Sequence, residues 1–150
     1  MFIQTKYLGE VEINREKIIQ FPSGLPGFGD ELEFVLLHLP NNQVFQILQS
    51  TTTANVAFIV TNPYLIYGTY EFELDDNMLE TLQIKDEKDV TVFSIVTLKD
   101  PFATSTLNLK APIIINTTNK LGKQYILNTD IYQSKASITN NDAADESRVR

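Results

Sequence analysis

Short runs of β-branched and aromatic residues recur along most of the chain and alternate with turn signals. The runs fall at residues 2–8, 17–21, 34–39, 44–50, 56–61, 90–98, 111–116 and 123–128. Turn-forming residues such as Asn62-Pro63 lie between them, and most of the intervening segments are short enough for hairpins. This spacing predicts an all-β domain whose neighbouring strands are mostly antiparallel.

The apolar pattern within the runs indicates how the sheet is arranged. Residues 90–98 alternate in part between apolar and small polar side chains, whereas residues 34–39 and 111–116 are apolar on both faces. Strands that are covered on both faces are typical of a closed or sandwiched sheet. We therefore expect an antiparallel barrel-like or semi-open barrel domain.

One segment departs from the strand pattern. Asn77 and Glu80 have the spacing of a capping box, and Met78, Leu79 and Leu82 fall on one helical stripe. We predict one short helix near residues 76–84.

The composition changes again near the C-terminal end. From residue 134 the chain reads SKASITNNDAADESRVR, which has almost no large apolar side chain. Such a segment buries too little apolar surface to offset the entropy of ordering. The expected organisation is a single domain over residues 1–133 and a flexible polar tail over residues 134–150.

The loop FPSGLPGF, residues 21–28, combines turn residues with large apolar side chains. Its prolines restrict φ and its glycines permit conformations that other residues avoid. We expect a rigid plug that holds its apolar side chains against the end of the barrel, with a ligand-gripping loop as the alternative. The residues assigned to this motif are Phe21, Gly24, Leu25, Pro26, Gly27 and Phe28.

Overall composition narrows the class of protein. The chain has 150 residues, 43% of them hydrophobic, and no cysteine, which excludes disulfides, thiolate zinc sites and thiol nucleophiles. The N-terminal residues lack the pattern of a secretion signal, and no apolar run approaches the ~18 residues of a membrane helix. We expect a cytoplasmic protein with no membrane partner.

The residue types needed for catalysis are sparse. His38 is the only histidine, and it lies in an apolar run where a core or edge position is the ordinary role. Dinucleotide-binding, phosphate-binding and zinc-protease motifs are missing from the sequence. We expect no enzymatic activity, no cofactor and no metal.

Charge is distributed unevenly. The net charge is −7, no lysine or arginine lies between Lys17 and Lys85, and residues 71–89 hold eight acidic residues against two lysines. Three interpretations compete: a solvated face, a calcium site that lacks the usual ligand spacing, and a surface that attracts a basic protein. Direct nucleic-acid binding is disfavoured, because an acidic surface repels phosphate.

The chain resembles the FliW family of bacterial flagellar assembly factors over about residues 1–133. The resemblance is carried, in order, by Thr5-Lys6-Tyr7-Leu8-Gly9, the loop 21–28, Leu48-Gln49-Ser50, residues 106–113, Ile115-Asn116 and Gln124-Tyr125-Ile126-Leu127. It implies a non-catalytic barrel-like domain with two alternative partners. One is flagellin, held chaperone-like before export; the other is CsrA, the RNA-binding repressor of flagellin translation, which is antagonised allosterically.

With this resemblance, the residues divide into candidate sites. The acidic residues would face the basic CsrA, and an exposed aromatic in the loop after residue 98 would meet an apolar helix of flagellin, unless it folds back onto the core. The partner-binding candidates are Glu71, Glu73, Asp75, Asp76, Asp100, Pro101, Phe102 and Thr104. Asn108 and Pro112 are assigned structural roles. The alternative function is a small-ligand or metal-binding β-barrel whose mouth is closed by residues 21–28.

Overall fold

The computed structural model describes residues 1–139. Within these residues the chain forms eleven strands, one α-helix and four 3-10 helices. The strands are β1 (Phe2–Gln4), β2 (Glu10–Glu12), β3 (Ile19–Gln20), β4 (Glu33–His38), β5 (Phe45–Ser50), β6 (Ala57–Thr61), β7 (Val90–Thr97), β8 (Thr106–Leu107), β9 (Ile113–Asn116), β10 (Leu121–Gln124) and β11 (Ala136–Ser137). The helices are η1 (Arg15–Lys17), η2 (Pro63–Leu65), α1 (Asp76–Thr81), η3 (Glu87–Asp89) and η4 (Phe102–Thr104).

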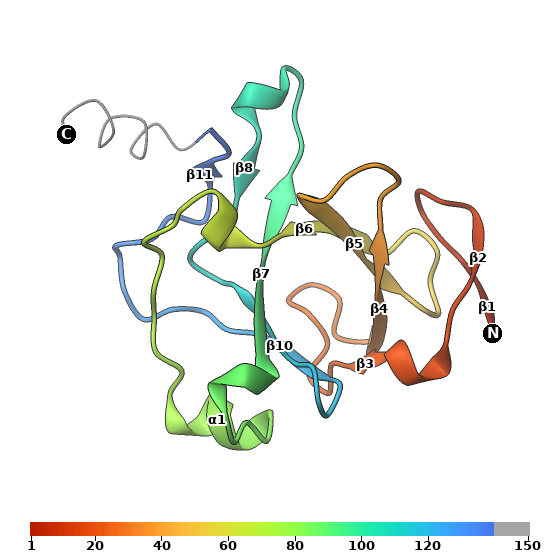
Figure 1. The fold of residues 1–150 in the computed structure, drawn as a ribbon, viewed down its shortest axis with the longest axis horizontal. Helices are drawn as coiled ribbons and strands as arrows, with labels where there is room; N and C mark the ends of the chain where they lie inside the picture. Colours follow the sequence, from red (N-terminus) through yellow and green to blue (C-terminus); the bar gives the residue numbers. More distant parts are fainter. Residues whose placement is uncertain (140–150) are drawn as a thin grey trace.

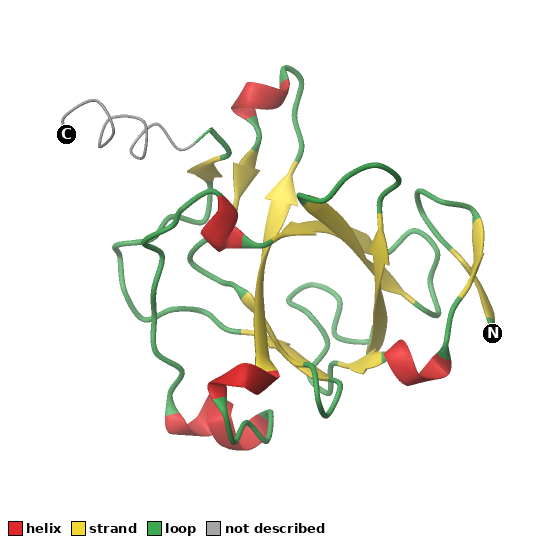
Figure 2. Cartoon of the chain, viewed as in Figure 1, coloured by secondary structure: helices red, strands yellow, loops and turns green. Residues whose placement is uncertain are grey.

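Seven strands close into a ring, which Figure 1 and Figure 2 show nearly end-on. The order is β7-β6-β5-β4-β3-β10-β9. The ring closes where β9 pairs with Val90–Phe93 of β7. The thinnest seam is the parallel contact of β10 with β3, where Leu121 alone pairs with Gln20. The predicted all-β, barrel-like and largely antiparallel fold is thus confirmed.

Much of the ring wall is covered on both its inner and its outer face, which explains the runs that are apolar on both faces. Along β9, Ile113 and Ile115 belong to the interior core, whereas Ile114 packs outward under α1. A second apolar layer covers the outside of β5, β6 and β7 with residues from the C-terminal part of the chain. The hairpin β1–β2 packs on the outer face of β4 through Ile3, Ile13 and Val35.

The loop 21–28 enters one end of the ring, seen as the faint segment inside it in Figure 1. Phe21 and Leu25 are buried at 0% and 2% exposure in the interior core, as expected for a plug. Phe28 differs from the expectation, because it is 40% exposed and its ring packs edge-on against Phe58. Leu25 and Phe28 are also joined by an isolated β-bridge within the loop.

The plug is tied to the end of β5 by Glu31. Its carboxylate accepts hydrogen bonds from the hydroxyls of Ser50, Thr52 and Thr53. These bonds favour the charged form, so the pKa of Glu31 lies below its usual value of 4.5, with Ser50 as the largest cause.

This network predicts a pH dependence of stability. Because the folded-state pKa of Glu31 is lowered, its stabilising contribution is complete above pH 4.5 and disappears as pH falls through the folded-state value. We expect the difference in unfolding free energy between the native chain and Glu31→Gln to shrink in urea titrations carried from about pH 7 to about pH 3. An unchanged difference over that range would contradict the role assigned to the carboxylate.

The short helix is present, but its boundaries differ from the prediction. Asp75, rather than Asn77, is the N-cap: its carboxylate accepts a hydrogen bond from the Met78 amide at 2.8 Å. The helix ends at Thr81 rather than near residue 84, because Gln83 adopts a left-handed φ of 54°. Met78 and Leu82 of the predicted stripe are buried against Ile114.

The predicted tail begins too early. Ala136 and Ser137 form β11, which pairs with Leu107 and Thr106 of β8, and Ala136 and Ile138 are buried. Small apolar side chains suffice here because the neighbouring layer already supplies the core, a fact invisible in local composition. The rest of the predicted tail, residues 140–150, lies outside the described residues.

Candidate functional site

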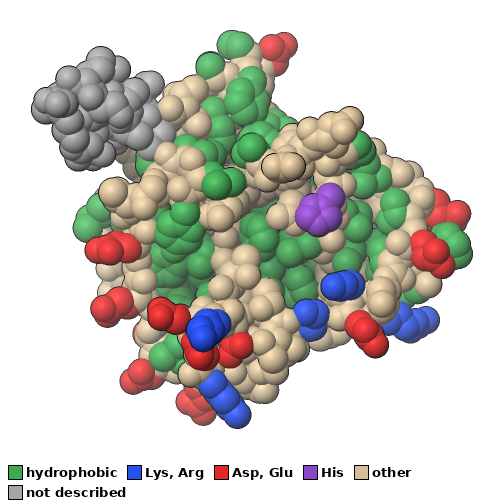
Figure 3. Space-filling view, in the orientation of Figure 1, with side chains coloured by type: hydrophobic (Ala, Val, Ile, Leu, Met, Phe, Trp, Pro, Cys, Tyr) green, Lys and Arg blue, Asp and Glu red, His purple; other side chains and the backbone are tan. Residues whose placement is uncertain are grey.

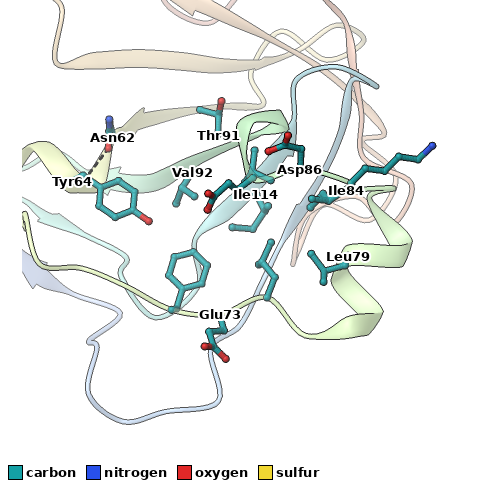
Figure 4. Close-up of a pocket in the computed structure, with 14 residues that line it drawn as sticks. Asn62, Tyr64, Glu73, Leu79, Ile84, Asp86, Thr91, Val92 and Ile114 are labelled. Atoms are coloured by element: carbon teal, nitrogen blue, oxygen red, sulfur yellow. Dashed lines mark hydrogen bonds between the residues drawn. The ribbon is translucent and has the colours of Figure 1, made fainter.

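An open groove of about 740 Å³ lies outside the ring beside α1. Its floor is apolar and comes from β7, β9, α1 and the segment before α1, as Figure 4 shows. The lining residues are Asn62, Tyr64, Phe72, Glu73, Leu74, Leu79, Ile84, Lys85, Asp86, Glu87, Val90, Thr91, Val92 and Ile114.

The groove exists because α1 covers only part of the ring wall. Val92 and Ile114 are paired neighbours on β7 and β9, and both pack outward in the cluster formed with α1. The helix buries Ile114 completely but leaves Val92 half-buried. A helix of only two turns therefore exposes an apolar strip of the wall that a partner can cover.

Acidic side chains stand at the edge of this strip. Glu73, Asp86 and Glu87 line the groove, and Lys85 is the one basic residue among the lining residues. Figure 3 shows acidic side chains gathered around the position of α1, close to a band of apolar side chains. The groove thus combines an apolar floor with a negatively charged rim.

Some of these carboxylates stabilise the local structure. Asp75 caps α1, Asp86 caps η3 by accepting from the Lys88 amide, and Asp89 accepts from the Thr118 hydroxyl at 2.7 Å. Others are exposed, and within the described residues their side chains make no hydrogen bond or ion pair; Glu71, Glu73 and Asp76 are among them. Charge without a structural role is available for a partner.

An aromatic cluster holds the acidic segment in place. The Tyr70 ring lies 5.3 Å from Phe72 and 4.6 Å from Tyr132, between ring centroids. The Tyr70 hydroxyl donates to the Leu109 carbonyl at 2.6 Å, and the Tyr132 hydroxyl accepts from the Glu71 amide at 3.0 Å. The backbone that carries Glu71 and Glu73 is therefore fixed to residues from the C-terminal part of the chain.

Burial favours the neutral form of two tyrosines in this region, Tyr70 and Tyr64. Desolvation raises the pKa of Tyr70 strongly and that of Tyr64 to a smaller extent, with nearby tyrosines adding to both shifts. A neutral phenol remains a hydrogen-bond donor at physiological pH. The cluster therefore serves as a rigid frame rather than as an ionisable group.

A second candidate surface lies beyond the other end of β7, at η4. Phe102 is 52% exposed, although its ring also contacts Phe45 at a centroid distance of 6.0 Å. Asp100, Pro101 and Thr104 are exposed around it, and the Thr104 hydroxyl donates to the Pro101 carbonyl at 2.7 Å. Phe102 is thus both supported by the barrel and accessible to a partner.

The structure does not bring the two predicted sets of residues together. Glu71, Glu73, Asp75 and Asp76 lie beside the start of β7, whereas η4 follows its end, and Figure 1 shows α1 and the η4 loop at opposite ends of the molecule. Eight residues of extended strand separate them, which is about 26 Å.

The remaining predicted residues have structural positions. The Asn108 side chain accepts from the Ala111 amide at 3.0 Å, and the buried Pro112 offers its carbonyl to the Tyr125 amide at 2.8 Å. Together they shape the connection from β8 to β9. His38 lies exposed at the end of β4 and lines neither the groove nor the η4 turn.

Sequence reasoning missed the groove floor. Val92 and Ile114 belong to runs that the hydrophobic pattern predicted as strands, and Tyr64 lies outside every predicted run. The available signal was the unbroken apolar run at 111–115, which shows that a strand is covered on both faces but not that one cover is incomplete.

Residues 1–139 contain neither a metal-binding cluster nor a membrane-spanning helix. No group of three or more histidine, cysteine, aspartate or glutamate residues within that range could hold a metal ion. None of the helices described there combines the length and the apolar content that crossing a bilayer requires.

Comparison with known proteins gives consistent matches. The family model described as FliW protein matches residues 2–138. A flagellar assembly factor FliW of Oceanobacillus iheyensis is 56% identical over 138 residues, 92% of this chain and 94% of that protein. The flagellar assembly factor FliW of Bacillus subtilis is 46% identical over 138 residues, 92% of this chain and 96% of that protein. A crystal structure of the flagellar assembly factor FliW superposes with a TM-score of 0.88 at 46% identity, covering 92% of this chain and 96% of that chain.

Proposed function

Because the chain belongs to the FliW family of flagellar assembly factors, we propose that it is a partner-switching binding protein that takes flagellin and CsrA in turn. In the cytoplasm it holds flagellin before export. Once flagellin leaves, the same molecule binds CsrA and relieves the repression of flagellin translation. Translation then follows secretion without any chemical step on this protein.

The acid-rimmed apolar groove is the observation that carries the proposal. A regulator that binds RNA needs a basic surface. Glu73 on the rim of the groove, with Glu71 and Asp76 in the same acidic segment, offers exposed negative charge that no internal partner neutralises. The apolar floor supplies surface that is removed from water on binding. The charges select the partner and raise the association rate. Rigid attachment of the acidic segment through Tyr70 and Tyr132 limits the entropy lost on binding.

Phe102 supports the second half of the proposal. A helix with an apolar stripe is recognised by exposed apolar or aromatic groups on a rigid frame. Phe102 meets this requirement because half of its side chain is exposed while Phe45 supports its ring. Leu98 and Val44, at 50% and 44% exposure, add apolar surface in the neighbouring loops.

Because the two candidate surfaces lie far apart, mutual exclusion of flagellin and CsrA does not follow from a shared contact surface. A standard interface covers about 800 Å² on each partner. The described chain exposes 9115 Å², so the footprints alone leave room for two partners. In the proposal, the bulk of one partner beyond its footprint reaches the surface used by the other.

Mixing experiments test the switch directly. We expect size-exclusion chromatography of this protein with purified flagellin and CsrA to give complexes with one partner or the other. Excess flagellin should release CsrA from a preformed complex. A stable complex that contains all three proteins would overturn the proposal.

Phe102→Ala tests the flagellin surface. We expect flagellin to bind about 30-fold more weakly, the effect of removing an exposed aromatic anchor worth about 2 kcal/mol. The melting temperature should change little, because the side chain is half exposed. The matched control is Phe2→Ala, which removes a 64% exposed aromatic from the N-terminal hairpin. Equal losses of affinity in the two variants would exclude a specific role for Phe102.

A further inference from the structure

The end of the ring opposite the plug is open. A cavity of about 430 Å³ lies there, at the ends of β3, β4 and β5 that are remote from loop 21–28. The register defines this end, because His38 pairs with Gln46 there, whereas Phe34 pairs with Ser50 at the plugged end. We call this cavity the mouth; its volume lies within the range of small-ligand sites.

The floor of the mouth is apolar. Ile19 and Ile115 belong to the interior core, and Leu36 packs against it while remaining partly exposed. Ile13, Val35 and Leu37 extend the apolar lining over the rim of β4.

The rim of the mouth is basic, in contrast to the rest of an acidic protein. Lys17 from η1 and Lys120 from the β9–β10 turn both line the cavity, with His38 beside them and Glu12 as the one acidic side chain. The chain as a whole carries −7, and its basic residues are absent between Lys17 and Lys85. Two segments far apart in sequence therefore place lysine side chains at the same opening.

Lys120 is held rather than loose. Its ammonium group donates a hydrogen bond to the Thr117 carbonyl, and its backbone has a left-handed φ of 57° in the turn. Its carbonyl accepts from the Gln20 amide at 2.8 Å, which fixes the turn to β3. The positive charge is thus placed at the edge of the apolar floor. Figure 3 shows the histidine and nearby basic side chains on the face that looks down the ring, with apolar side chains beside them.

We propose that the mouth binds a small amphipathic carboxylate, with the carboxylate between Lys17 and Lys120 and a short aliphatic chain on Ile19, Leu36 and Ile115. The two charges match the anionic end, and the floor removes apolar surface of the chain from water. This site is distinct from the acid-rimmed groove and from Phe102. It therefore stands or falls independently of the partner switch.

Three probes separate the contributions to binding. Octanoate has both features, acetate has the charge alone, and octylamine has the same chain with the opposite charge. We expect octanoate to raise the melting temperature and to give saturable heats in isothermal titration, and acetate and octylamine to do neither at equal concentration.

Matched variants locate the site. Lys17→Gln with Lys120→Gln should weaken octanoate binding by about tenfold, the loss expected for charge-assisted contacts at a partly exposed site. Each ligand-induced shift is compared with the melting temperature of the same variant without ligand, so a general loss of stability is not counted. The control Lys135→Gln with Lys99→Gln makes the same charge change at exposed positions outside the mouth.

Three results would overturn the proposal. Octanoate could fail to bind at millimolar concentration, octylamine could bind as well as octanoate, or the Lys17 and Lys120 variant could bind octanoate like its control. In the first case the mouth does not bind an amphipathic carboxylate. In the second and third cases, binding is apolar or lies elsewhere.

Discussion

Replacing Gly24 by alanine is expected to lower the free energy of unfolding by about 3 kcal/mol. Gly24 has a φ of +64°, and a Cβ there would lie 2.7 Å from both the Cα of Gly29 and the carbonyl oxygen of Phe28. The left-handed conformation costs about 1–2 kcal/mol for an alanine, and backbone atoms cannot move aside as a flexible side chain can. The plug would have to shift, and Leu25 would leave its place in the core.

Gly27→Ala is the matched control for this prediction. Gly27 lies in the same loop with a φ of +83°, but nothing approaches its added Cβ within 4 Å. It should lose about 1 kcal/mol, the conformational cost alone. Urea unfolding of the two variants measures the difference. Equal losses would show that close approach of the loop backbone at Gly24 does not contribute to stability.

The second large effect concerns the acidic surface. Glu71→Lys, Glu73→Lys and Asp76→Lys together should weaken CsrA binding about 100-fold at low salt, while the fold remains intact. Each reversal removes an attraction and adds a repulsion worth up to about 1 kcal/mol at an exposed site, so three sites give about 3 kcal/mol. Asp75 is left unchanged because its carboxylate caps α1, and its loss would weaken the helix as well as the charge.

The control carries the same change in net charge at other exposed positions, namely Glu10→Lys, Glu16→Lys and Asp30→Lys. Affinity is measured by titration at low and at physiological salt, because screening reduces contacts between exposed charges. If both triple variants lose the same amount of affinity for CsrA, the effect belongs to overall charge. If neither weakens binding, the acidic surface has no part in the interaction.

Several features followed directly from local pattern. The runs at 34–39, 44–50, 56–61 and 90–98 became β4 to β7 with small shifts at their ends. The helical stripe of Met78 and Leu82 became the buried face of α1. Local pattern succeeds here because periodicity reports which side chains must avoid water, whatever covers them.

The helix cap, strand β11 and the position of Phe28 depended on their surroundings in the folded chain. Asn77 was as good a capping residue as Asp75 by type, and only the position of the first turn decided between them. The shift in composition at residue 134 hid β11, whose small side chains are buried by a layer that other segments had already built. Phe28 looked like a core residue, but it is 40% exposed and packs edge-on against Phe58.

The sequence by itself determined the class of fold, the short helix, the plug at one end of the barrel and the uneven distribution of charge, because each depends on residues that are close in the chain. Only the tertiary structure decided where the ring closes, which part of its outer wall stays uncovered beside α1, and that Lys17 and Lys120 line the same cavity. These features join segments that are far apart in sequence. Their positions depend on strand register and on the limited reach of a two-turn helix, neither of which a local pattern specifies.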